Sequence, residues 1–90
     1  MSVLLITYDQ TKLNLEVDPV PRFIKNYKHV QVSPTSFAIE TGEKTRTIFN
    51  RLIPFLSKNA HLLIVTVMQP FAVQGSELAQ EWLSKHLPED

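Results

Sequence analysis

Asp9 is the first residue whose type and position could do chemistry. It closes the apolar run Leu4-Leu5-Ile6-Thr7-Tyr8-Asp9, where a turn-forming glycine would be more ordinary. A carboxylate is a ligand that Mg²⁺ prefers, and a metal-bound water can attack a phosphodiester. The simpler alternative is an acid that accepts hydrogen bonds from loop N–H groups, because only one carboxylate per chain is visible there. Asp9 is therefore a candidate catalytic and metal-binding residue.

A second group of residues could bind an anion. The formal net charge is zero, but the segment 22–58 holds seven Lys/Arg and only two Glu, a net of +5. Charge concentrated in this way can attract phosphates. The candidate nucleic-acid-binding residues are Arg22, Lys25, Lys44, Arg46 and Arg51.

Lys44 and Arg46 are predicted to lie in the first turn of a helix, where the macrodipole disfavours cations. A phosphate docked at the start of that helix would account for them. The alternative is that Glu40 and Glu43 neutralise them locally. The sequence leaves both interpretations open.

Several classes of protein are excluded by what the sequence lacks. There is no cysteine, so disulfides and thiolate metal sites are impossible. The three histidines have no metal-ligand spacing, and the two isolated glycines, Gly42 and Gly75, form no phosphate-binding loop. No apolar run approaches the roughly 20 residues that span a bilayer. We expect a cytoplasmic protein with no membrane contact.

The apolar periodicity predicts four strands and three helices that would position these residues. The first helix begins at Asp18-Pro19, with Asp18 as the N-cap and proline at the first helical position. Pro54 should kink or tighten the end of the second helix. Ser76 should cap the third. The expected strands are 3–8, 29–32, 36–41 and 61–68, and the expected helices are 19–28, 44–57 and 77–86; residues 10–18 read as a loop in which 13–17 could form a brief edge strand.

The order of these elements predicts a single α+β domain over residues 1–90. We expect a ferredoxin-like β-α-β-β-α-β unit: a four-stranded antiparallel sheet, helices on one face, and an additional C-terminal helix. The first and third strands should be central. Residues 4–6 and 62–65 are apolar at consecutive positions, so both faces of the sheet need cover. The last helix, a second subunit, or both would cover the second face.

Helical spacing also predicts which residues are buried. The inward residues should be Val20, Phe23, Ile24 and Tyr27 in the first helix, Ile48, Leu52, Phe55 and Leu56 in the second, and Leu78, Trp82 and Leu83 in the third.

Three short motifs, taken with their order, carry a resemblance to a known family. They are LLITYDQ in the first strand, Ser36-Phe37-Ala38 at the start of the third strand, and Trp82-Leu83 in the last helix. The chain resembles the SinR-like group, small bacterial and phage proteins in the superfamily of the CRISPR-associated adaptation dimers. The resemblance implies a ferredoxin-like fold and a homodimer. It also implies that Asp9 faces its symmetry mate and is associated with a divalent metal, so Mg²⁺ is the cofactor to test.

Three functions follow from these observations. The first is a homodimer that binds nucleic acid or a nucleotide, without clear catalytic machinery. The second is a metal-dependent nuclease using Asp9 from both subunits. The third is a protein-interaction module of a phage or mobile-element system. The zero net charge and the lack of further acids near Asp9 favour the first and third.

Overall fold

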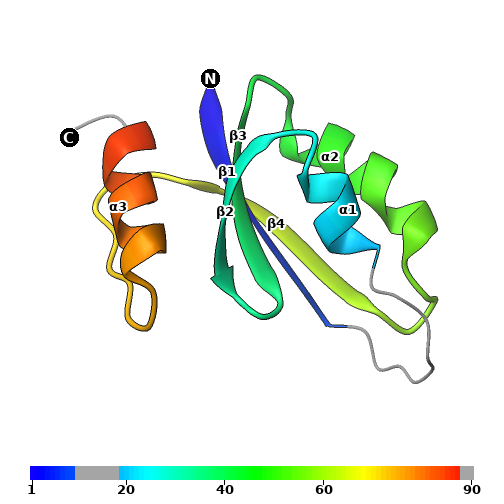
Figure 1. The fold of residues 1–90 in the computed structure, drawn as a ribbon. Coiled ribbons are helices and arrows are strands. Elements are labelled where there is room, and N and C mark those ends of the chain that lie inside the picture. Colours follow the sequence, from blue (N-terminus) through cyan, green and yellow to red (C-terminus); the bar gives the residue numbers. More distant parts are fainter. Residues whose placement is uncertain (10–18, 88–90) are drawn as a thin grey trace.

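The structure is a computed structural model that describes residues 1–9 and 19–87 (Figure 1). The strands are β1 (Ser2–Asp9), β2 (Lys28–Ser33), β3 (Ser36–Thr41) and β4 (His61–Val67). The helices are α1 (Val20–Ile24), α2 (Thr45–Leu52), the short 3-10 helix η1 (Ile53–Phe55) and α3 (Glu77–His86). The predicted brief strand at 13–17 lies outside the described residues.

The four strands form one antiparallel sheet in the order β2-β3-β1-β4. The α+β class and the antiparallel sheet are therefore confirmed, and β1 and β3 are central as predicted. Leu5 lies opposite Ala38 on β3 and opposite Val65 on β4. Since side chains alternate along a strand, this register decides which residues face each layer of helices.

One face of the sheet packs against α1 and α2. Alternate residues of β1 are buried there, namely Leu4, Ile6 and Tyr8, together with Phe37 and Ile39 of β3. The helices contribute Val20 and Ile24 from α1, and Ile48 and Leu52 from α2, all of them fully buried. This cluster is the main hydrophobic core.

The opposite face is only partly covered. Figure 1 shows α3 on the far side of the sheet from α1 and α2. There Leu83 and Leu87 pack on Val3 and Ala38, and α3 contacts β2. The other end of this face has no helix over it within the described residues: Leu63 is 56% exposed and Val65 is 38% exposed. The apolar runs predicted that both faces of the sheet must be covered. On this second face, α3 covers only part of the sheet.

The first helix differs from its prediction. It ends at Ile24, and Lys28, expected as its last residue, is the first residue of β2. Lys28 pairs with Glu40 in the β2–β3 ladder, which requires extended backbone there. The N-cap is Pro19, with no side-chain cap hydrogen bond; Asp18, the predicted cap, lies outside the described residues.

The second helix shows the tightened end that Pro54 predicted. Regular α-helix stops at Leu52, and residues 53–55 continue as η1. A 3-10 turn rotates side chains differently from an α-helix. Phe55, expected inside, is consequently 58% exposed.

The third helix has the predicted bounds and the predicted cap. The Ser76 hydroxyl accepts a hydrogen bond from the backbone N–H of Ala79 at 3.1 Å. Its buried residues are Ala79 and Leu83, whereas Leu78 is 74% exposed and Trp82 is half-buried. The prediction of Leu78 as an inward residue is wrong, because α3 turns its small Ala79 toward the sheet.

Candidate functional site: cations on the helix layer

The five candidate anion-binding residues all lie on the layer formed by α1 and α2, and all are exposed. Arg22 is within α1, and Lys25 is its C-cap residue. Lys44 is the N-cap residue of α2, with extended backbone, and not a first-turn residue as predicted. Arg46 and Arg51 lie within α2. The fold thus brings the five residues to one layer, but it places them in different surroundings.

Arg51 is held by two neighbours. Its Nη2 lies 2.6 Å from Oε2 of Glu43, and its Nη1 donates to Oε1 of Glu43 at 2.8 Å. Nη1 also donates to the Tyr27 hydroxyl at 3.2 Å, and that hydroxyl donates to Glu43 at 3.2 Å. Hydrogen bonds to Tyr27 and Glu43, with the charge of Glu43, raise the pKa of the Arg51 guanidinium. This cluster joins Tyr27, between α1 and β2, to Glu43 before α2 and to the last turn of α2, and it leaves Arg51 paired.

Arg46 lies on the other flank of α2. Its guanidinium carbon is 5.0 Å from the centre of the Phe49 ring, a cation–π contact. Arg46 and Phe49 line a small hollow with Thr45 and with Ile64 of β4. The two arginines of α2 therefore point to different sides, Arg51 toward Tyr27 and Arg46 toward β4.

The carboxylates of Glu40 and Glu43 do not neutralise Lys44 and Arg46, which was one of the two interpretations of the sequence. Glu43 pairs with Arg51, and Glu40 lies 3.2 Å from Nδ1 of His86 on α3. Within the described residues, Arg22, Lys25, Lys44 and Arg46 take part in no ion pair. Four exposed cations thus remain for an external anion.

Asp9 is exposed at the end of β1, opposite His61 at the start of β4. The two residues line a shallow depression that also includes Thr7, Tyr8, Thr35, Leu62 and Leu63. Across residues 1–9 and 19–87, no group of three or more His, Asp or Glu is placed to hold a metal ion.

His86 makes a contact that sequence reasoning missed. The His86 ring stacks on Trp82, with ring centres 4.1 Å apart, and its Nδ1 faces Glu40 on β3. The partners are 46 residues apart, so no local pattern could reveal the pair. The contact ties the end of α3 to the sheet and accounts for both His86 and Glu40 structurally.

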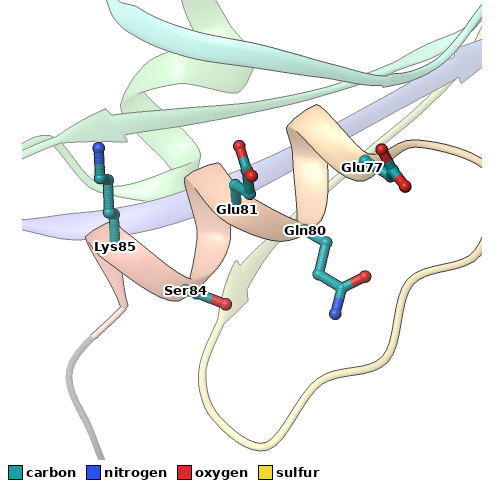
Figure 2. A pocket seen from close by; sticks show the side chains of 5 residues that line it. All are labelled: Glu77, Gln80, Glu81, Ser84 and Lys85. Carbon is teal, nitrogen blue, oxygen red and sulfur yellow. The ribbon is translucent and has the colours of Figure 1, made fainter.

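The outer surface of α3 carries a second, shallow depression (Figure 2). It is lined by Glu77, Gln80, Glu81, Ser84 and Lys85. Figure 2 shows Glu81 and Lys85 directed to one side of the helix and Gln80 and Ser84 to the other. All five come from one helix, so this is a helix surface, not a cavity between elements.

Comparison of the sequence with protein-family models, curated proteins and solved structures finds no match. None of the helices in the described part of the chain is long and apolar enough to cross a membrane.

Proposed function

We propose that the protein is a ferredoxin-like homodimer that binds a phosphate-bearing ligand, nucleic acid or a nucleotide, through the cations of its α1–α2 layer. Four exposed cations of that layer carry the proposal, because they make no ion pair with any other residue that the structure describes: Arg22, Lys25, Lys44 and Arg46. The central position of β1 and β3 supports the ferredoxin-like assignment. The short motifs shared with the SinR-like group support the dimer.

The chemistry of the layer suits binding more than turnover. Exposed Lys and Arg contact phosphate through charge and hydrogen bonds without reading bases. Asp9, the candidate catalytic residue, lies at the end of β1 and not among these cations. The nuclease alternative therefore depends on a metal shared between two Asp9 residues across the dimer axis.

A specific observation also favours the protein-interaction alternative. Leu63 and Val65 are exposed side by side on one face of β4, with the half-buried Leu5 next to Val65. An exposed apolar patch of this kind marks a contact surface for protein. That surface is used by a second copy of the chain or by a different protein, and the dimer measurement below separates the two.

Nucleic-acid binding is tested by titrating labelled single- and double-stranded oligonucleotides and nucleotides at several salt concentrations. Replacing Arg22, Lys44 and Arg46 with Gln should weaken binding, because these are exposed cations that make no ion pair within the described residues. It should also lower the slope of log K against log salt by about one unit for each lost phosphate contact.

The matched control replaces Lys28, Lys58 and Lys85 with Gln, which removes the same charge from positions outside the layer. That variant should bind nearly as the wild type does. Equal weakening in both variants would show a non-specific charge effect. No wild-type binding at low salt would overturn the proposal and leave the protein-interaction function.

A further inference from the structure

The two edges of the sheet are protected very differently. β2, at one edge, begins with Lys28, and its register with β3 shifts between Gln31 and Ser33. α3 also contacts β2. A charged residue, an irregular register and a neighbouring helix are the devices by which proteins keep an edge strand from pairing with another chain. The β2 edge has all three.

β4, at the other edge, has only one of these devices, since α2 contacts it as α3 contacts β2. It pairs with β1 from His61 to Val67 in an unbroken register. Residues 62–67 contain no charge, proline or glycine. Within the described residues, no strand pairs with the outer side of β4. Half of its backbone N–H and C=O groups therefore point outward from an apolar strand, the arrangement in which a sheet accepts another strand.

We propose that the outer edge of β4 pairs antiparallel with β4 of a second copy, about a two-fold axis through Ile64. This inference rests on the proposed homodimer and specifies its interface. A two-fold axis perpendicular to the sheet places one residue of the strand opposite its own mate. Ile64 is the midpoint of β4, so centring there pairs all seven residues. Leu63 then lies opposite Val65 of the second copy, and His61 lies opposite Val67.

The strand complements itself in this register. Leu63 and Val65 are the exposed apolar residues of β4. The two-fold axis places Leu63 of each copy beside Val65 of the other copy, so both side chains lose contact with water. Cross-strand pairs of branched apolar side chains stabilise a sheet. The strand itself carries no Lys, Arg, Asp or Glu. Arg46 lines a hollow with Ile64, so the axis brings the two Arg46 residues of the dimer toward each other; both are exposed, and salt screens the repulsion between exposed charges.

The arrangement also bears on ligand binding. A two-fold axis perpendicular to the sheet keeps the α1–α2 layers of both copies on the same face. Their exposed cations then form one continuous basic surface across the dimer, long enough for an extended phosphate backbone. A dimer that packed sheet face against sheet face would put these layers on opposite sides.

Disulfide trapping tests the register directly, since the chain has no cysteine of its own. Leu63→Cys and Val65→Cys proteins with different tags are mixed and mildly oxidised. Residues opposite each other in an antiparallel pair have Cα atoms about 4.5–5.5 Å apart, within the range of a disulfide. The mixed Leu63→Cys/Val65→Cys product should exceed the share that random pairing gives. Gln31→Cys, on the β2 edge, is the control and should stay uncross-linked.

Light scattering supplies the second measurement. The wild type should show twice the chain mass of 10.3 kDa. Val65→Lys should shift it to the single-chain mass, because a lysine on an edge strand opposes pairing. Leu78→Lys, an equally non-conservative change at an exposed position on α3, should stay dimeric. Circular dichroism reports whether each variant is folded.

The outcomes separate this inference from the proposal on which it rests. A wild type that stays at 10.3 kDa at micromolar concentration overturns both the homodimer and the β4 pairing. A dimer that persists in Val65→Lys and gives no excess of mixed disulfide overturns the β4 pairing alone and leaves a homodimer with another interface. Oligonucleotide binding is measured independently of either result.

Discussion

Arg51, in the last turn of α2, and Glu43, which precedes the N-cap of α2, form a two-point ion pair with N–O distances of 2.6 and 2.8 Å. Two parallel N–H···O contacts give this geometry more direction than a single contact. The Tyr27 hydroxyl forms hydrogen bonds with both residues of the pair. The ion pair therefore occupies one of the five cations that were predicted to bind an anion. A ligand phosphate would have to compete with Glu43 for Arg51.

Replacing Glu43 with Gln should release Arg51 from that competition. We expect tighter binding of oligonucleotides and a salt slope steeper by about one unit, as Arg51 becomes a phosphate contact. Fluorescence anisotropy at several salt concentrations measures both. Glu81→Gln on α3 removes the same charge at a distant site. Identical effects of the two variants would show that only net charge matters, contrary to this prediction.

The docking of α3 depends on Leu83, which is buried against Val3 and Ala38. Leu83→Ala should lower the free energy of unfolding by about 2–5 kcal/mol, as for other buried leucines. The emission of Trp82, the single tryptophan, should shift to the red as α3 loosens.

Leu78→Ala is the matched control, because it removes the same atoms from an exposed position of the same helix. Its effect should stay within about 0.5 kcal/mol. A large loss at Leu78, or none at Leu83, would mean that α3 packs by a different face.

The cap of α3 makes a separate prediction. Ser76→Ala removes the acceptor of the Ala79 N–H and should cost about 1 kcal/mol in urea unfolding. Ser84→Ala, on the exposed face of the same helix, should be neutral or slightly stabilising, since alanine favours helix. If both substitutions behave alike, the cap hydrogen bond contributes nothing measurable.

Asp9 is tested with Mg²⁺ or Mn²⁺ and mixed single- and double-stranded substrates. Because Asp9 is exposed at the end of β1, away from the cations of the α1–α2 layer, we expect wild type and Asp9→Asn to be equally inactive and equally stable. Gel analysis of the substrates and thermal melting measure this. Cleavage by wild type that Asp9→Asn loses, at unchanged melting temperature, would establish the nuclease function instead.

The elements were largely predictable from local patterns. Alternation along residues 29–32, the apolar run at 61–67, the Ser76 cap and the stop at Pro54 each act through the backbone within a few residues. The antiparallel sheet with β1 and β3 central followed from the β-α-β-β-α-β order of elements and the right-handed crossover rule. The five cations were found by composition alone, and their place on one layer followed from the helices that carry them.

The tertiary structure decided what those residues do to one another. Glu43 pairs with Arg51 and Glu40 with His86 because the fold brings together side chains that are distant in the sequence or lie on separate elements. Leu78 is exposed and Ala79 buried because packing against the sheet selects the helical stripe through Ala79 and Leu83 and not one through Leu78. Periodicity showed that the runs 4–6 and 62–65 need cover, and the predicted strand order already placed the fourth strand at an edge. Only the tertiary structure shows that α3 leaves Leu63 and Val65 of β4 exposed. Cover is a relation between elements, and no single strand encodes it.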